Sequence, residues 1–420
     1  MLKNTSKTIH FILDRESFGC YCIVLSLAVR LLWLFLINPD LSGDALFFHE
    51  KACQISDGLG YTYQGQPTAF YPVGYPAFLA GLYYFFGKSV FIARLANIFL
   101  YMIILLVFRV MMQKISKNHL FTSMALLLLA FYPNHIAYTN LLFNETLFAA
   151  LFLWASCVLF IALEHKKIIF FVASGLLFGC AALVRPAVAL CPLIVLVLKL
   201  LNNQGRLKWI SGIFILLLCM ELVLIPWQIR NYRHFNSFIF VSTNFSHNLF
   251  VGNHEEATGR YAPITSEIKR YKAMDSEEQY DSFAMQSVKQ YICQKPFEAL
   301  KRIPLKVYYF MYPGMEGISW NMKGLENSQL SVLRILRLMG NAGYLLLLFL
   351  FFASVIDHQF NRKRLYSFGE KYFLAMIVYY LLVSMIFFGE SRYHFHLIPF
   401  VIWFVSVFIS DILHEKRLAT

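Results

Sequence analysis

The sequence has few charged residues. Asp, Glu, Lys and Arg make up 15% of its 420 residues, and long apolar runs recur along the whole chain. A soluble domain of this size would not carry so many uninterrupted apolar segments, so the composition indicates a polytopic membrane protein. We find no internal repeat or low-complexity tract, and no A-x-A-like site follows the first apolar run, so we expect no cleavable signal sequence.

Acidic residues are also scarce, with 24 Asp and Glu against 37 Lys and Arg, which gives a formal net charge of +13. Many of the basic residues lie in short loops between apolar runs, as they do in the cytoplasmic loops of membrane proteins. We therefore predict membrane lipids, and no nucleic acid, as partners. The eight cysteines fall mostly inside apolar runs. Only Cys53 and Cys293 lie in long polar loops, and we expect no disulfide between them.

The apolar runs predict an all-α polytopic membrane protein with about ten transmembrane helices and both termini in the cytoplasm. If the run Phe70–Gly87 also crossed the membrane, every later basic loop would face outward. We therefore predict that it lies on the outer surface as a juxtamembrane helix, because three prolines and Gly74 stand at its start. The predicted spans are Gly19–Ile37, Val90–Met112, Leu120–Tyr138, Thr146–Leu163, Ile168–Leu183, Ala187–Leu201, Ile210–Gln228, Val332–Val355, Tyr372–Phe388 and Leu397–Ile412.

These spans divide the chain into five parts. We predict a cytoplasmic N-terminus (1–18), a transmembrane core (19–229) whose first outer loop is 38–89, a large extracytoplasmic loop (230–329), C-terminal transmembrane helices (330–412) and a cytoplasmic tail (413–420).

The large loop predicts a small mixed outer region. Phe238–Val241 is typical of a short strand, and Asp275 is placed as the N-cap of a helix. The apolar face of that helix is predicted to carry Phe283, Val288 and Ile292. After Pro296 a second amphipathic segment is expected to turn Lys301, Arg302 and Lys306 toward lipid phosphates.

Ionisable side chains gather at the predicted outer face. They are Asp44, Arg94, Glu145, Arg185, Arg230, Arg233, Glu390 and Arg392. Two charges lie deeper, Arg30 and Glu221, and we predict that they form an ion pair. The alternative is that Arg30 extends outward to the interface.

Several segments, taken in order, resemble a known family. They are an outer loop with an early Asp, GLGYTYQGQPTAFYPVGYPAFLAGLYYFFG, FIARLANIF, YPNHIAYTNLLFNETLF, ALVRP, PWQIRNYRHFNSFIFVSTNFSHNLFVGNHEEATGRY and GESRYHFHLIPF. This order resembles the bacterial GT-C membrane glycosyltransferases related to lipid A aminoarabinose transferases and protein O-mannosyltransferases. The resemblance runs from Gly19 to about Ile412, although no single motif in it is specific.

The resemblance implies an inverting transfer of a sugar from a polyprenyl-phosphate donor to a lipid, glycan or protein acceptor outside the cytoplasm. The protein would then lie in the bacterial inner membrane with its active site on the extracytoplasmic face. It would need no cofactor, because the polyprenyl-phosphate sugar is its donor substrate. Asp44 matches the family's first-loop catalytic Asp, Glu145 matches its acidic residue in the second outer loop, and Arg230 falls where the family places contacts to the donor phosphate.

The chain also departs from its relatives. Asp44 is followed by Ala45, where O-mannosyltransferases have an Asp-Glu pair. Residues 69–71 replace the Lys that aminoarabinose transferases carry before their proline pair. The resemblance therefore specifies neither aminoarabinose as the sugar nor lipid A as the acceptor.

The two carboxylates have a chemical and a structural interpretation. Asp44 could take the proton of an acceptor hydroxyl, or it could cap the helix that begins at Ala45. Glu145 could orient the acceptor or the sugar, or it could simply favour the start of a helix.

The basic and aromatic candidates also carry two interpretations. Arg230, Arg233 and Arg392 could stabilise the leaving phosphate without a metal, or they could anchor loops to lipid headgroups. Tyr71, Tyr75 and Tyr393 could contact the sugar, or they could belong to an interfacial aromatic belt. The histidines show no spacing that predicts a metal site.

Other functions stay open at this point. A transporter or flippase of lipid-linked sugars would share the aromatic and basic outer surface. It would, however, need polar residues along a path through the membrane, whereas this chain concentrates them on one face. A non-catalytic assembly subunit and a polymerase or ligase of lipid-linked glycans are further alternatives.

Overall fold

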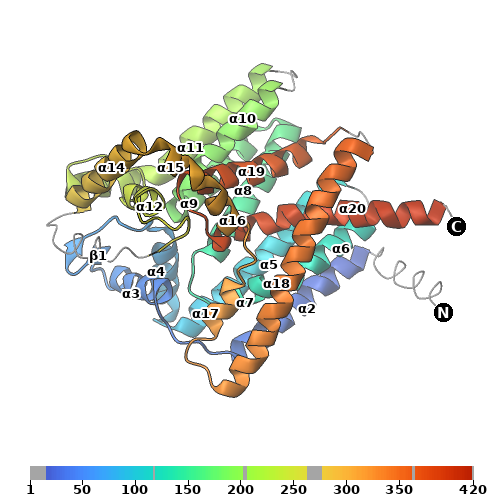
Figure 1. Cartoon of the computed structure of the whole chain (residues 1–420), viewed down its shortest axis with the longest axis horizontal. Coiled ribbons are helices and arrows are strands. Elements are labelled where there is room, and N and C mark those ends of the chain that lie inside the picture. The colour runs from blue at the N-terminus through green and yellow to red at the C-terminus, as the bar shows by residue number, and fades with distance from the viewer. Residues whose placement is uncertain (1–15, 117–118, 202–205, 263–276, 362–364, 419–420) are drawn as a thin grey trace.

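The computed structural model describes residues 16–116, 119–201, 206–262, 277–361 and 365–418. Helices dominate these residues, and the all-α polytopic architecture is confirmed. Within them, seven helices are long and apolar enough to cross a membrane. They are α2 (Glu16–Leu36), α5 (Val90–Ile115), α8 (Glu145–His165), α11 (Arg206–Phe235), α18 (Asn327–Ile356), α19 (Phe368–Ile386) and α20 (Ile398–Leu418) (Figure 1).

Three further predicted spans are shorter apolar helices in the structure. They are α6 (His119–Ala130), α9 (Ile168–Val184) and the pair η1 (Pro186–Leu190) and α10 (Cys191–Leu201). Helix α8 forms the centre of the bundle and packs against α5 and α9, while α9 in turn packs along α11. Gly175 and Gly179 permit this last contact, because a Cβ at Gly175 would lie 2.4 Å from the Leu216 carbonyl oxygen. Small residues at such interfaces let membrane helices approach closely.

The predicted span Leu120–Tyr138 is wrong in one respect, because the helix breaks in the middle. Helix α6 ends at Ala130, and α7 (Pro133–Tyr138) restarts with its proline in the first turn. A proline has no backbone N–H to continue the preceding helix. The carbonyls released at the end of α6 find side-chain donors instead: Tyr101 Oη donates to the Leu129 oxygen at 2.8 Å.

Arg30 is the second donor at this break. It is fully buried, and its Nη1 donates to the Ala130 oxygen at 2.8 Å and to Ser26. Its guanidinium carbon lies 3.7 Å from the centre of the Tyr101 ring. The predicted ion pair with Glu221 is therefore wrong: Arg30 binds the broken helix.

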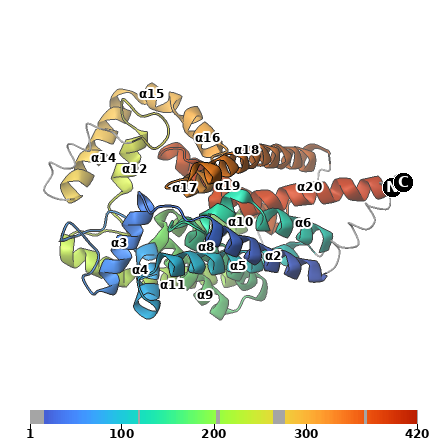
Figure 2. The same ribbon diagram turned by 90° about the horizontal axis from the view of Figure 1, so that it is seen from below.

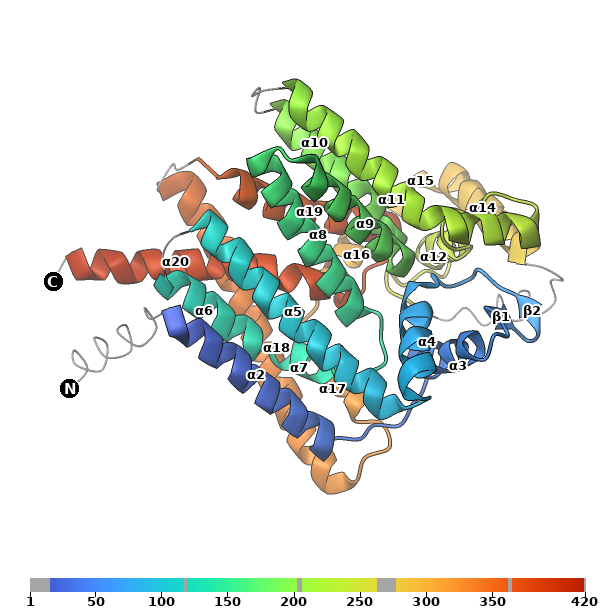
Figure 3. The same ribbon diagram turned by 180° about the vertical axis from the view of Figure 1, so that it is seen from behind.

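The polar loops gather at the end of the bundle opposite the start of α2 and the end of α20 (Figures 1 and 3). The first loop contains α3 (Asp44–Ser56), the two-residue strands β1 (Thr62–Tyr63) and β2 (Gln66–Pro67), and α4 (Gly74–Phe86). Tyr63 pairs with Gln66 across a turn in which Gln64 and Gly65 have φ values of 51° and 80°. With 13 residues, α4 packs mainly against α3, and it is not among the seven helices that could cross a membrane.

The large loop contains α12 (Phe245–Gly252), α14 (Glu277–Gln294), α15 (Pro296–Lys301), α16 (Ile303–Met311) and α17 (Glu316–Asn321). Figure 2 shows α12, α14 and α15 as a layer at the same end of the molecule as α3 and α4. The short helix η3 (Ser391–Leu397) follows α19 and leads into α20. Helix α14 begins at Glu277 in the structure. The predicted N-cap, Asp275, lies outside the described residues.

The structure corrects three predictions for the large loop. Phe238–Val241 is a loop rather than a strand, and the Val241 oxygen accepts a hydrogen bond from Trp227 Nε1 at 2.7 Å. Ile292 is 42% exposed, because the buried face of α14 runs through Tyr280, Ala284, Val288 and Tyr291. Lys306 is buried rather than turned toward lipid. Cys53 and Cys293 are free thiols, as expected.

Candidate active site

Asp44 is the first residue of α3, directly after the helix N-cap Gly43. Gly43 has a φ of 56°, and a Cβ there would lie 3.0 Å from the Trp320 ring. A glycine therefore suits this entry to the helix. The Asp44 carboxylate does not cap α3. It accepts a hydrogen bond from Arg392 Nη1 at 2.9 Å, and its side chain remains 34% exposed. It is thus held in place and still accessible.

A second ion pair lies beside the first. Glu145 begins α8 with only 2% of its side chain exposed, and Arg185 Nη2 lies 2.6 Å from its Oε1. Arg185 also donates to Asn144 Oδ1 through Nη2 at 3.0 Å. Arg185 ends α9 with extended dihedral angles (φ −142°, ψ 104°), as expected for a residue before a proline. The Arg-Pro sequence thus ends the helix at the residue that pairs with Glu145.

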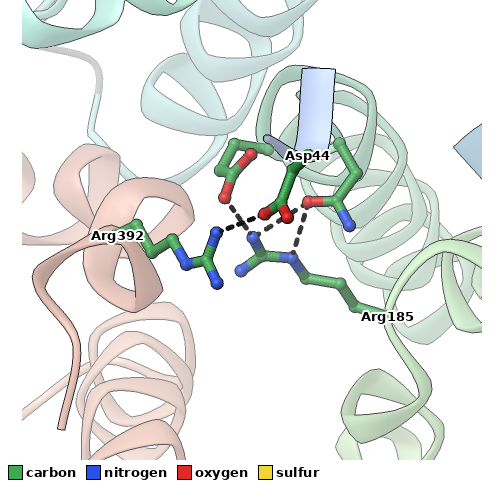
Figure 4. Close-up of polar contacts among 5 residues, drawn as sticks. Asp44, Arg185 and Arg392 are labelled. Carbon is green, nitrogen blue, oxygen red and sulfur yellow. Dashed lines mark hydrogen bonds and ion pairs between the residues drawn. The ribbon is translucent and has the colours of Figure 1, made fainter. Parts of the chain in front are cut away.

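The two guanidinium groups converge. Figure 4 shows the Arg185 and Arg392 side chains extending toward each other beside Asp44. The Tyr393 ring centre lies 5.8 Å from the guanidinium carbon of each arginine. Arg392 Nε is buried and has no hydrogen-bond partner among the described residues. Two arginines with an available N–H beside a carboxylate form an arrangement suited to an anionic ligand.

A carboxyl pair extends this cluster. Ser391 Oγ donates to Glu316 Oε1 at 2.6 Å, and the Glu390 carboxyl group interacts electrostatically with Glu316. Burial of Glu390, together with the charge of Glu316, raises the pKa of Glu390 to about 7. The positive charge of Arg392 lowers the pKa of Glu390 and so opposes this increase.

Two of the three tyrosine candidates lie at the cluster. Tyr71 packs on Phe47 with ring centres 4.9 Å apart, and burial and the charge of Asp44 raise the pKa of its hydroxyl. Tyr393 lies between the two arginines, as described. Tyr75 is only 1% exposed, and its hydroxyl lies 3.3 Å from Asn97 Nδ2. Tyr75 therefore belongs to the core.

The other two arginine candidates lie elsewhere. Arg230 donates to the backbone oxygens of Thr68 at 2.9 Å and Tyr61 at 2.7 Å, which ties the first loop to α11. Arg233 is exposed and makes no ion pair with a described residue. The structure thus brings together Asp44, Glu145, Arg392, Tyr71 and Tyr393, and it leaves Arg230, Arg233 and Tyr75 outside the cluster.

Sequence reasoning did not choose four members of the cluster: Asn144, Arg185, Glu316 and Glu390. The sequence could have pointed to Arg185 and Glu390 as site residues, because both are charged residues at the predicted outer ends of spans. No such indication existed for Glu316, since this residue lies within a long polar loop. Among the described residues, no group of three or more His, Cys, Asp or Glu side chains could hold a metal ion.

No protein-family model matches the chain, and no curated protein matches it in sequence. Solved structures do match. The chain aligns with the Archaeoglobus fulgidus oligosaccharyltransferase tethered with an acceptor peptide, with a TM-score of 0.58 and 12% identity over 96% of this chain. It aligns equally with AglB from the same organism in complex with an inhibitory peptide and a dolichol-phosphate, with a TM-score of 0.59 and 11% identity over 96% of this chain. The chain has the GT-C fold.

The chain spans about half the length of those archaeal enzymes, 51% in both alignments. A weaker similarity, with a TM-score of 0.46 and 12% identity, covers 94% of this chain and 78% of ArnT from Cupriavidus metallidurans bound to undecaprenyl phosphate. The two alignments with the archaeal oligosaccharyltransferase confirm the GT-C fold predicted from the order of the sequence segments.

Proposed function

We propose that the chain is an inverting glycosyltransferase. It moves a sugar from a polyprenyl-phosphate donor to a lipid, glycan or protein acceptor on the extracytoplasmic face of a bacterial inner membrane. The observation that carries the proposal is the accessible carboxylate of Asp44 beside two converging arginines, Arg185 and Arg392. Support also comes from AglB, whose fold this chain shares and which binds a dolichol-phosphate and a peptide.

The reaction follows from the groups present. Asp44 takes the proton of the acceptor hydroxyl while the hydroxyl oxygen attacks the anomeric carbon of the donor. The bond from that carbon to the phosphate oxygen breaks, and the polyprenyl phosphate leaves with the electron pair. Arg392 and Arg185 stabilise the charge that develops on the phosphate through charge-assisted hydrogen bonds. Attack opposite the leaving group inverts the anomeric centre.

The remaining residues of the cluster orient these groups. Asn144 and Glu145 fix the guanidinium of Arg185, so it reaches the phosphate without further rearrangement. Tyr71 and Tyr393 offer rings to the apolar faces of the sugar. The donor lipid enters from the bilayer, which the exposed apolar surfaces of the spanning helices contact.

The experiment compares wild type with Asp44→Asn in membranes that are supplied with radiolabelled polyprenyl-phosphate sugars and envelope acceptors. We expect wild type to transfer label and Asp44→Asn to lose at least about 100-fold in rate, the usual contribution of a general base. Asp57→Asn is the matched control, because Asp57 lies at the other end of α3 in an exposed ion pair with Lys88.

Two outcomes would overturn the proposal. Equal transfer by wild type and Asp44→Asn would remove Asp44 from the mechanism. No transfer by wild type, with donor appearing on the opposite leaflet, would favour a transporter of lipid-linked sugars.

A further inference from the structure

Glu277, the first described residue of α14, binds the first outer loop through its side chain. Its carboxylate accepts hydrogen bonds from the Ala69 N–H at 3.1 Å, from Thr243 Oγ1 at 2.9 Å and from Thr68 Oγ1. Ala69 is fully buried and Thr68 is 3% exposed. Hydrogen bonds to an ionised acceptor are stronger than those between neutral groups. One carboxylate of the large loop thus holds two consecutive residues of the first loop, and the proposed mechanism does not yet use it.

The face of α14 explains why Glu277 reaches the first loop and its neighbour Glu278 does not. Tyr280 and Ala284 belong to the buried face of α14 and follow Glu277 at helical spacing. Residues at this spacing share one side of a helix. Glu277 therefore lies on the inner side, whereas Glu278 is exposed and accepts a hydrogen bond from Ser237 Oγ at 3.0 Å.

Arg230 binds the same stretch of the first loop through its carbonyl groups. Its guanidinium donates to the Thr68 oxygen at 2.9 Å and to the Tyr61 oxygen at 2.7 Å. The Thr243 N–H also donates to the Ala69 oxygen at 2.9 Å. Strands β1 and β2, which lie between Tyr61 and Thr68, have two residues each, and an isolated hairpin is marginally stable at best. Contacts from α11 and the large loop therefore hold the end of this hairpin in place.

Residues 68–71, which we call the arm, lead from this junction to the candidate active site. The Tyr71 ring at the end of the arm packs on Phe47 of α3, with ring centres 4.9 Å apart. Phe47 lies one helical turn after Asp44 on the same helix. Tyr61 Oη donates to the Tyr71 oxygen at 3.1 Å, so the backbone of the arm is held at both of its ends.

Helix α14 supports the middle of the arm as well. The Phe70 ring centre lies 5.4 Å from the His247 ring centre, and His247 Nδ1 is hydrogen-bonded to Tyr280 Oη at 2.6 Å. Tyr280 is 3% exposed and lies on the same face of α14 as Glu277. The position of the arm beside α3 is therefore set from the large loop, by Glu277 directly and by Tyr280 through His247.

We propose that Glu277 is a positioning residue of the site: it holds the arm so that the Tyr71 ring stays beside Asp44 and contacts the donor sugar. The inference rests on the proposed function, since it takes Tyr71 as a sugar contact. Without the carboxylate, the Ala69 N–H and the hydroxyl groups of Thr68 and Thr243 lose their acceptor. The arm then no longer has one position, and the sugar loses an ordered ring.

The first test needs no substrate. Hydrogen–deuterium exchange of the purified protein in lipid nanodiscs follows the amides of residues 68–71, which exchange when their hydrogen bonds open. We expect Glu277→Ala to speed this exchange by about tenfold, because the Ala69 N–H loses a charged acceptor. Glu278→Ala is the matched control on the exposed side of α14 and should exchange like wild type.

Glu277→Gln is the conservative variant. Its amide oxygen can accept from the Ala69 N–H and Thr243 Oγ1, and its NH2 group can donate to Thr68 Oγ1. We therefore expect Glu277→Gln to restore the slow exchange that Glu277→Ala loses.

The second test measures the donor KM and kcat of sugar transfer. A sugar contact that is equal in the bound donor and the transition state appears in KM. We expect Glu277→Ala to raise the donor KM by about tenfold and to change kcat by less than about threefold. In a Tyr71→Ala background, Glu277→Ala should change KM by less than about twofold, because both substitutions remove the same ring contact. Thermal unfolding checks that every variant is folded.

The outcomes separate the two proposals. Absence of transfer by wild type would count against the proposed function, and the exchange experiment would still test the hold of Glu277 on the arm. Unchanged exchange in Glu277→Ala would overturn the inference. Equal KM increases from Glu277→Ala in the wild-type and Tyr71→Ala backgrounds would also overturn it, because Glu277 would then act by a route other than Tyr71. A loss in Glu277→Gln as large as that in Glu277→Ala would exclude the hydrogen bonds as the cause.

Discussion

At the scale of single residues, the sequence could place the polar groups on one face but could not choose among the arginines. Asp44, Glu145 and Arg392 are far apart in the chain, and the alternation of spans alone puts them at the same end of the bundle. Which arginine joins them depends on where each guanidinium finds acceptors. Arg230 donates to two backbone carbonyls of the first loop, whereas Arg185 reaches Glu145. No sequence pattern encodes that difference.

Arg185 and Arg233 should therefore differ in their effect on transfer. Arg185→Ala alone would leave Glu145 buried without its partner, which costs about 3–5 kcal/mol of stability in buried pairs. The double variant Arg185→Ala/Glu145→Gln removes that charge and should fold. We expect it to lose about 100- to 1,000-fold in kcat/KM, because one donor to the leaving phosphate is missing.

The exposed Arg233→Ala variant is the control, and it should keep wild-type transfer within about twofold. Full activity in the double variant would show that Arg185 is a structural partner of Glu145 and does not contact the donor. Thermal unfolding in detergent checks that each variant is folded before its rate is measured.

At the scale of elements, the helices were predictable because their apolar runs are long and their ends are marked by basic or proline residues. The break between α6 and α7 was not, because the donors to its free carbonyls, Arg30 and Tyr101, lie on other helices. Phe238–Val241 has the composition of a strand, but no second strand among the described residues lies beside it, and Trp227 Nε1 donates to its last carbonyl. A local sequence pattern thus predicts a helix or strand correctly only where the tertiary contacts of that segment favour the same structure.

Lys306 shows how one element fixes another. From α16 its ammonium donates to the Met385 and Ile386 oxygens at 3.1 and 3.3 Å, which are the last carbonyls of α19. A cation is favourable at the C-terminus of a helix. Lys306→Met should therefore lower the free energy of unfolding by about 1–3 kcal/mol, since buried acceptors lose their donor. Lys301→Met, at an exposed position on α15, should change it by less than about 0.5 kcal/mol.

The contribution of Lys306 to the free energy of unfolding should depend on pH. Burial and the nearby Arg302 lower the pKa of Lys306 from 10.5 to about 8. Between these values the unfolded chain binds more protons than the folded one, so the folded protein gains stability as pH rises from about 8 to about 10.5. Lys306→Met lacks this gain. Unfolding of both proteins at pH 8 and pH 10 measures it, and an identical pH response would show that the lysine titrates normally in the fold.

At the scale of the whole molecule, the two long polar regions meet at one end of the bundle, and the start of α2 and the end of α20 lie at the other (Figures 1 and 3). The basic turns between spans, such as Lys166 and Lys167 between α8 and α9, lie away from the site. The positive-inside rule therefore predicts that the site faces away from the cytoplasm. This orientation would let the proposed transferase meet acceptors that have already left the cell interior.

Thiol labelling in intact cells tests this orientation. Cys293 is an exposed free thiol near the end of α14, so a membrane-impermeant maleimide should label it without permeabilisation. In a Cys293→Ser background, Lys167→Cys should be labelled only after the membrane is opened, because the positive-inside rule places its exposed turn in the cytoplasm. Since all eight cysteines are free, replacing Cys293 breaks no disulfide. Labelling of Lys167→Cys in intact cells, with Cys293 protected, would invert the topology and place the proposed chemistry on the cytoplasmic side.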